Sequence, residues 1–387
     1  MNKPTRLQSG SLLGRHLILQ VALVVLIAAA LLWMGENARY AMHKRGIAFG
    51  LDFLSEAAGF AIGQAAFTFS AGETYLRAFL VGVGNTIVLA VVAIVTATAL
   101  GTAIGFARLS SNQLLTSAGR LYVELFRNSP PLLQILFLYT VFPILPAPRQ
   151  AWSLFDAVFV SNRGIVAPVP EHPLALFGLL TCFALGAFAA VILYRMVDRR
   201  RRQGRPPFPL VGALYAALLL LPPLVYAFIR ADDLAWSVPH LRGFNFSGGM
   251  TLSPEFLALY LGLSLYAAAF IAEVVRAGIL SVDRGQIEAA NAISLGSWDR
   301  LLKIVAPQAL RVIVPPMASQ YISIVKNSSL GVAIGYPELF SLTNTVLTYS
   351  GHTIEAVSIM AAIYLLISLA IGATSSVINQ SVQVKER

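Results

Sequence analysis

Long runs of uncharged, apolar residues decide what this chain can fold into. Phe79–Ala107 and Ala356–Val384 each contain no charged side chain. A hydrocarbon core about 30 Å thick needs about 20 mainly apolar residues per helix. Only 12% of the chain is charged, against roughly 25% in a soluble domain. The sequence therefore predicts an all-α, polytopic membrane protein.

Eight such runs are predicted to span the membrane. They are Leu17–Met34, Phe79–Ala107, Pro131–Pro148, Leu174–Tyr194, Phe208–Ile229, Phe256–Ala272, Val312–Pro337 and Ala356–Val384. The third is weak because Pro143, Pro146 and Pro148 lie near its end, and the seventh because Lys326 interrupts it. The first run has 18 residues and lacks a clear small-residue cleavage site after it, so it is predicted to be a span and not a signal peptide.

The distribution of Lys and Arg predicts the orientation, because cytoplasmic loops carry an excess of both. With the N-terminus inside, the inner segments hold 18 of these residues and the outer segments hold 8. Both termini are therefore predicted to be cytoplasmic. The net charge of +10 then requires no nucleic acid, and the basic loop 195–207 is expected to meet anionic headgroups.

The chain divides into four parts. Residues 1–78 supply a cytoplasmic tail, an extra span and an outer segment, in which one or two interfacial helices are expected. Residues 79–147 and 255–387 form a core, and 148–254 form an inserted helical hairpin with outer loops. The single Cys182 excludes an intrachain disulfide and a cysteine metal cluster. In the second span, Gly101 and Gly105 form a small-xxx-small pair, which lets helix backbones approach closely; the alternative is ordinary packing between membrane helices.

Ionisable residues at membrane depth are the first candidates for function. Glu273 and Arg276 lie on one helix face near the inner end of the sixth span, either as a local salt bridge or as part of an inner gate. A charge at the centre of a span costs about 2.5–3.5 kcal/mol, so Lys326 must face protein or water. With Asn327 beside it, Lys326 predicts a polar pathway lining; the alternatives are snorkelling or an ion pair with Glu338 or Glu273.

Residues 283–307 interrupt the apolar pattern on the cytoplasmic side. Asp283 followed by Gln286 resembles a capping box, so a helix is predicted to begin there. Ser297 is predicted to cap a second helix, and Pro307 to end it. Two short amphipathic helices joined by a turn make a compact knob. Its acidic residues and bent shape favour docking onto another protein over lying on headgroups.

The knob resembles the EAA loop of binding-protein-dependent ABC importer permeases. The residues that match in identity and spacing are Glu288, Ala289, Ala290, Ile304 and Pro307. Two positions differ from the usual pattern: Ser294 takes the place of a glycine, with Gly296 two residues later, and Ala306 replaces a leucine.

Further stretches are similar to the polar amino acid uptake branch of that family. They include GNTIVLAVVAIVTATALGTAIGFARLS (84–110), YVELFRNSPPLLQ (122–134) and VKNSSLGVAIGYPEL (325–339). The extra first span and the inserted hairpin resemble the Q-type permease subunit of general L-amino acid transporters. The resemblance implies a MetI-like permease core in the bacterial inner membrane.

The resemblance also implies the partners. The chain contains no GxxxxGK[ST] phosphate loop, so ATP and Mg are expected on a separate cytoplasmic ATPase, with no cofactor in this chain. A second permease subunit and a periplasmic amino acid-binding protein are expected to complete the importer. The knob would couple to the ATPase. An amino acid is a zwitterion, so Lys326 would meet its carboxylate and Glu273 its ammonium group.

Two other classes of protein were weighed. An ion-coupled secondary transporter also uses intramembrane charges, but it favours inverted repeats, and it has no need of an EAA loop. A membrane-embedded enzyme requires a cluster of His, Asp or Glu. The five histidines lie in predicted loops or at span edges and form no ligand-spaced pair.

Overall fold

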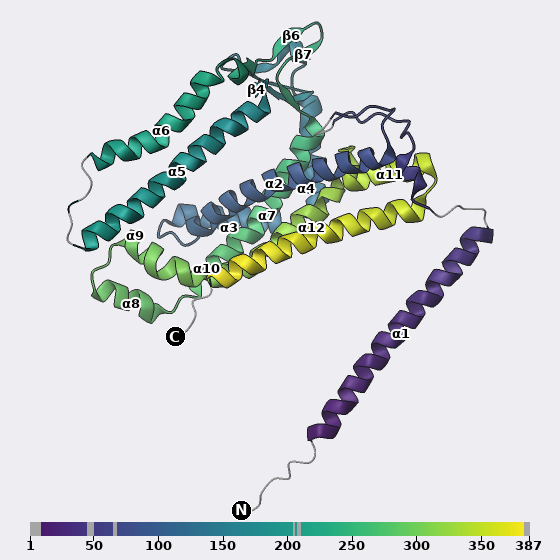
Figure 1. The fold of residues 1–387 in the computed structure, drawn as a ribbon, viewed down its shortest axis with the longest axis horizontal. Coiled ribbons are helices and arrows are strands. Elements are labelled where there is room, and N and C mark those ends of the chain that lie inside the picture. The colour runs from purple at the N-terminus through teal and green to yellow at the C-terminus, as the bar shows by residue number, and fades with distance from the viewer. Residues whose placement is uncertain (1–8, 45–49, 65–67, 204–205, 207–209, 383–387) are drawn as a thin grey trace, which may run out of the picture.

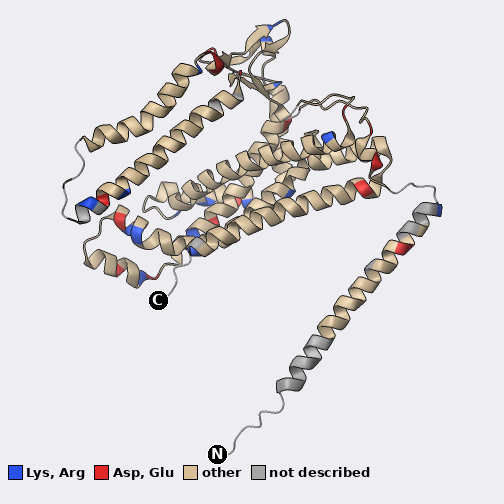
Figure 2. Cartoon of the chain, viewed as in Figure 1, with Lys and Arg blue, Asp and Glu red and all other residues tan. Residues whose placement is uncertain are grey.

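The computed structural model describes residues 9–44, 50–64, 68–203, 206 and 210–382. Its helices are α1 (Ser9–Lys44), α2 (Tyr75–Ala107), α3 (Gln113–Asn128), α4 (Pro131–Val141), α5 (Pro173–Arg202), α6 (Val211–Ile229), α7 (Pro254–Leu280), α8 (Arg284–Ala292), α9 (Ser297–Arg300), α10 (Ala306–Asn327), α11 (Leu339–Ser350) and α12 (Thr353–Val382). Within these described ranges, seven helices are long and apolar enough to cross a membrane, which confirms the predicted fold class. Charged residues gather near the ends of these helices (Figure 2).

Seven of the eight predicted spans correspond to these long helices. The remaining run, Pro131–Pro148, forms the 11-residue helix α4, about 16 Å long, followed by a 3₁₀ turn at Phe142–Ile144; this apolar helical stretch is too short to cross a bilayer. The amphipathic helix α3 precedes it, and Ser129 and Pro130 separate the two. The chain therefore passes through this region as a kinked pair of helices and not as one span.

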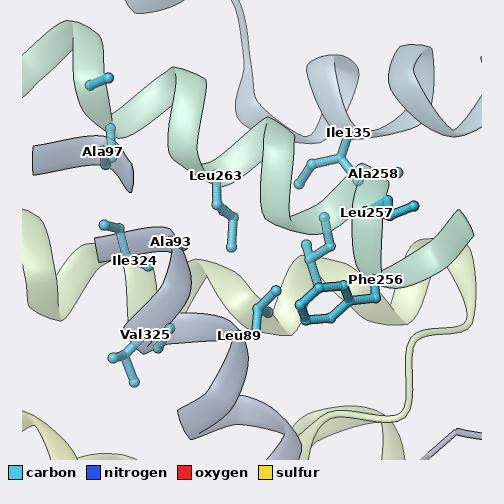
Figure 3. Packing of buried hydrophobic residues seen from close by; sticks show 14 of the residues in the cluster. Leu89, Ala93, Ala97, Ile135, Phe256, Leu257, Ala258, Leu263, Ile324 and Val325 are labelled. Carbon is cyan, nitrogen blue, oxygen red and sulfur yellow. The ribbon is translucent and has the colours of Figure 1, made fainter. Parts of the chain in front are cut away.

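The core is built around α2 and α7, which pack along most of their length (Figures 1 and 3). Two glycines explain the close approach. A Cβ atom added at Gly101 would lie 2.7 Å from the side chain of Ile271, and one at Gly105 would lie 3.0 Å from Val275. Leu89, Ala93 and other buried side chains of α2 then meet α4, α7 and α10. The predicted packing role of this glycine pair is confirmed.

A break in the helical chain separates α10 from α11. A 3₁₀ segment, Ser328–Ile334, follows α10, and Gly335 then takes a left-handed φ of 77°. Glu338 caps α11, and its side chain accepts hydrogen bonds from the backbone N–H groups of Phe340 and Ser341. Backbone groups freed by the break are thus satisfied inside the protein, as a low-dielectric setting demands.

The inserted hairpin consists of α5 and α6, which pack against each other. Its helices lie beside the core in Figure 1. The hairpin buries little of its apolar surface. In the most apolar stretch of α5 6% of the residues are buried, and in that of α6 none are. The loop between the helices was predicted to be basic, but residues 204–205 and 207–209 lie outside the described residues. The hairpin is therefore anchored to the core mainly through its outer end.

That outer end carries short β-strands that the sequence analysis did not predict. They are β1 (Trp152–Leu154), β2 (Val158–Ser161), β3 (Gly164–Ala167), β4 (Val169–Pro170), β5 (Trp236–Ser237), β6 (His240–Arg242), β7 (Asn245–Ser247) and β8 (Met250–Leu252). One antiparallel sheet has the order β1-β2-β3-β8, so it joins segments on either side of the hairpin. Ser253 directly follows β8 and caps α7, which attaches the sheet to the core.

The segment before α2 differs from the prediction. Helix α1 continues to Lys44, and the only helical element described between Gly50 and Tyr75 is the 3₁₀ turn Asp52–Ser55. Phe53 and Phe60 are buried against α2 and α11, and the Gly50 N–H donates to Glu355 of α12 at 3.2 Å. Because its aromatic residues pack into the protein, this described segment does not form the interfacial helices that were expected.

Candidate functional site

The predicted knob begins as expected. Asp283 is the N-cap of α8, and its carboxylate accepts a hydrogen bond from the Gly285 N–H at 2.6 Å. Ala290 is buried, and Ile287 packs beside Val282 and Val305 at the base of the knob. Glu288 and Ala289 are exposed on the opposite side of the helix. The Glu-Ala-Ala motif therefore presents one face to solvent and one to the protein.

The turn of the knob depends on Ser294. This residue adopts a φ of 56°, in the left-handed region where glycine is favoured. The resemblance places a glycine here, and the backbone shows why. Gly296 is not a substitute, because its φ of −60° is open to any residue. The Leu295 N–H donates to the Ala290 carbonyl at 3.1 Å, which closes the turn after α8.

The second helix of the knob does not stop where the sequence predicted. Gly296, not Ser297, is the N-cap, and Ser297 is the first helical residue. The chain continues through α9 and a π-helical turn, Leu301–Val305, directly into α10, with Pro307 in its first turn. A proline in a helix lacks an N–H and clashes with an earlier carbonyl, and the wider π-turn gives it room. Ile304 lies within this turn, so the knob and α10 form one continuous helical rod.

The surface of the knob exposes large apolar side chains. Ile293 is 71% exposed, Trp298 74% and Leu302 61%. The side chain of Arg300 hydrogen-bonds to Asn291, and Lys303 forms a salt bridge to Asp299 at 2.6 Å. An aromatic and aliphatic patch with a polar surround is typical of a protein-binding surface.

Helix α10 carries an exposed polar stripe that includes Lys326. Ser319, Ser323 and Lys326 are all exposed and follow each other at spacings of four and three residues, so they share one face. Asn327 is half-buried beside them. Among the described residues Lys326 forms no ion pair, so neither Glu338 nor Glu273 neutralises it within 4.0 Å. Neither serine was predicted as part of this surface, although their spacing from Lys326 places all three on one helix face.

The opposite face of α10 borders an apolar groove of about 780 Å³. Helices α2, α7, α10 and α12 line this groove, and its few polar side chains include Thr98 and Tyr321, whose hydroxyls lie 3.1 Å apart. Its residues on α10 include Ile313, Met317 and Val325. Polar and apolar surfaces of α10 thus point in different directions. The charged and hydrogen-bonding groups of α10 are therefore concentrated on the Lys326 stripe and not in this groove.

Glu273 lies in a cluster of arginines from three helices. Its carboxylate is 2.5 Å from Arg108 at the end of α2, 3.1 Å from Arg276 of α7 and 3.8 Å from Arg127 of α3. The side chain of Glu273 is 25% exposed. The cluster does not include Lys326. The proposed contact of Glu273 with an ammonium group stays a prediction, and the observed ion pairs give this carboxylate a structural role.

Glu338, directly after the predicted span Val312–Pro337, is a second buried carboxylate and caps α11. It is fully buried, and besides the two backbone N–H groups of α11 it accepts a hydrogen bond from the Tyr364 hydroxyl of α12 at 2.8 Å. Nearby, Asn85 of α2 donates to the Pro337 carbonyl at 2.7 Å. These bonds hold α2, α11 and α12 together at the break beside Lys326.

Known proteins resemble this chain over nearly its full length. A family model described as binding-protein-dependent transport system inner membrane component matches residues 207–384. The putative amino-acid ABC transporter permease protein YhdX of Escherichia coli is 42% identical over 378 residues, which cover 96% of this chain and 95% of that protein. The general L-amino acid transport system permease protein AapQ of Rhizobium johnstonii is 38% identical, with 96% and 93% covered.

A solved structure also matches the chain. It is described as the crystal structure of an amino acid ABC transporter with histidines, and it covers 79% of this chain and 95% of its own. Its sequence is 18% identical, and the TM-score is 0.47.

Proposed function

Because the chain belongs to the family of amino-acid ABC transporter permeases, we propose that it imports L-amino acids across the bacterial inner membrane as one of two permease subunits. The chain is a multi-pass transport subunit of an ATP-driven importer. Under this proposal ATP and Mg bind to a separate cytoplasmic ATPase. A periplasmic binding protein delivers the substrate to the outer side of the permease.

The continuous rod from the knob into α10 is the observation that supports this function most strongly. The exposed patch of Ile293, Trp298 and Leu302 provides a surface for the ATPase. Movement of the docked ATPase would reach Lys326 through an unbroken helix of 31 residues, about 46 Å long. A rigid element of this kind can transmit a rigid-body displacement between the two sites.

The coupling element extends from 283 to 307. In this proposal Glu288 and Ala289 contact the ATPase, while Ala290 anchors α8 to the protein. Ser294 and Gly296 shape the turn, and Ile304 and Pro307 carry the helix into α10. Such a division of roles follows from the exposure of the first two residues and the burial of Ala290.

The substrate pathway is proposed to run along the polar stripe of α10. Lys326 would attract the carboxylate of the amino acid, and Asn327, Ser319 and Ser323 would offer hydrogen-bonding groups. An exposed ammonium group at membrane depth is costly against lipid, which supports a water-filled or protein-lined surface at this position.

Co-purification tests the coupling. The whole importer is expressed with a tagged permease, and the ATPase is expected to co-purify with the wild-type chain. Trp298→Ala should weaken this association about 30-fold, since a buried aromatic anchor contributes about 2 kcal/mol or more. Phe155→Ala, which removes an aromatic residue that is 90% exposed from the turn between β1 and β2, is the matched control. Equal retention of the ATPase by both variants would contradict the docking surface.

An ion-coupled secondary transporter is the alternative. Uptake of labelled glutamate is measured in cells depleted of ATP while the ion gradients are kept. The importer proposed here should stop, because its energy comes from the ATPase. Uptake that persists in the absence of ATP would favour ion coupling. Competition by unlabelled amino acids in the same assay would define the substrate range.

A further inference from the structure

The arginine cluster around Glu273 has more positive charge than its single carboxylate can balance. Arg108, Arg127 and Arg276 all lie within 4.0 Å of this carboxylate, so the cluster carries a net charge of +2. Arg120 and Glu124, on the same helix as Arg127, are both exposed and of opposite sign, so they leave the excess unchanged. A partly buried excess of positive charge calls for an anion.

The cluster lies at one edge of the hydrocarbon core. Helix α7 has no charged residue between Glu255 and Glu273, a distance of 18 residues and about 27 Å along the helix. This length matches the thickness of a bilayer core, about 30 Å. On α2, Arg108 is likewise the first charged residue after the apolar run. The guanidinium groups therefore lie at the depth of lipid phosphate groups, on the side predicted to be cytoplasmic.

The neighbouring helix α3 has an apolar surface directed away from the protein. Leu114, Leu121 and Leu125 are 77%, 67% and 60% exposed, and they recur at spacings of seven and four residues. A helix with such an apolar stripe is suited to lie at the membrane boundary with the stripe against the acyl chains. Arg127 follows this stripe and is 46% exposed, while its guanidinium also lies 5.5 Å above the ring of Phe270.

We propose that this cluster binds the phosphate group of an anionic phospholipid in the inner leaflet. Arg127 and Arg276, whose side chains are 46% and 34% exposed, are the donors. Guanidinium groups pair with phosphate oxygens through two parallel hydrogen bonds. Arg108 is only 12% exposed and holds Glu273 in place between the helices. The acyl chains lie along the leucine stripe of α3. A bound lipid of this kind ties α2, α3 and α7 together at the inner face.

Spin-label spectroscopy tests the site. The full chain is placed in nanodiscs of phosphatidylcholine that contain a trace of spin-labelled phosphatidylglycerol or phosphatidylcholine. The immobilised fraction of each gives their relative association constants, and the wild-type chain is expected to favour phosphatidylglycerol. Arg127→Gln and Arg276→Gln should each lower this preference about fivefold, the contribution expected of one cation near a membrane surface.

Controls separate this explanation from others. Arg163→Gln removes an exposed arginine from the β2–β3 turn and should leave the preference unchanged. Excess soluble glycerol phosphate should fail to displace the labelled lipid; displacement would identify a site for free phosphate. No preference in the wild-type chain, or its loss when the second permease subunit binds, would overturn the proposal. Because Arg127 is nearly half exposed, its variant decides the matter even if Arg276→Gln fails to fold.

Discussion

Replacing Gly101 by alanine should force α2 and α7 apart. The added Cβ atom would lie 2.7 Å from Ile271 and 2.8 Å from the carbonyl oxygen of Ala268. Ordinary contacts begin near 3.4 Å, so one helix must move by about 0.7 Å. A backbone carbonyl cannot rotate away as a flexible side chain can. The displacement therefore extends over the longest packed interface in the protein.

The magnitude follows from two opposing terms. Overpacking a well-packed core costs about 1–3 kcal/mol, and a contact with a backbone atom belongs at the upper end of that range. Alanine is better than glycine in a helix by about 1 kcal/mol. The net loss for Gly101→Ala is therefore about 2 kcal/mol. For a protein of this size, that difference lowers the melting temperature by about 2.5 °C.

Thermal unfolding of the full chain in detergent, followed by circular dichroism, measures this effect. Gly372→Ala is the matched control, because this glycine lies in α12 and a Cβ there would have no heavy atom within 4 Å. It should melt at or slightly above the wild-type temperature. Gly105→Ala, whose nearest contacts are 3.0 Å, should fall between the two. Equal melting of the Gly101 and Gly372 variants would refute the role assigned to close helix approach.

Three further predictions concern the site. Ser294→Gly should keep the ATPase bound, whereas Ser294→Val, a β-branched residue at a φ of 56°, should deform the turn and release it in co-purification. Lys326→Met should leave the chain in the membrane, with insertion more favourable by about 3 kcal/mol, and abolish uptake of labelled amino acid; normal uptake would remove Lys326 from the pathway. Glu338→Leu should lower the melting temperature more than Tyr364→Phe does. The Glu338 variant leaves the backbone N–H groups of Phe340 and Ser341 without their acceptor, whereas the Tyr364 variant removes a single hydroxyl donor.

Much of the fold was predictable because a bilayer imposes a length and a polarity on each span. Seven predicted spans are long helices, and Gly101 and Gly105 lie where α2 meets α7. The strands of the outer loops escaped prediction for a physical reason. Each strand is two to four residues long, and β3 pairs with β8, more than 80 residues later in the chain. No local sequence pattern therefore indicates the sheet.

The candidate site, like the fold, was predicted only in part. Local signals were reliable where one side chain meets its own backbone, as at the Asp283 cap. They failed at Pro307, where a helix end was predicted. The helix continues because the π-turn Leu301–Val305 accommodates a proline, which has no N–H to donate. They also failed for Glu273, whose partners Arg108 and Arg127 come from helices that are distant in sequence. Pairing between distant helices depends on their packing, which residue spacing does not encode.

The continuity through Pro307 changes how force can pass through the protein. If the helix ended at this proline, the knob would be joined to α10 by a hinge, and a push from the ATPase would be lost in bending. In the structure the π-turn keeps the chain helical from Ser297 to Asn327. The far end of that rod reaches the break that the hydrogen bonds of Glu338 hold in place. Under the proposed coupling, displacement of the knob would be carried along this helix toward Lys326 and the polar stripe beside it, with Pro315 and Pro316 inside α10 as the positions where the helix can bend.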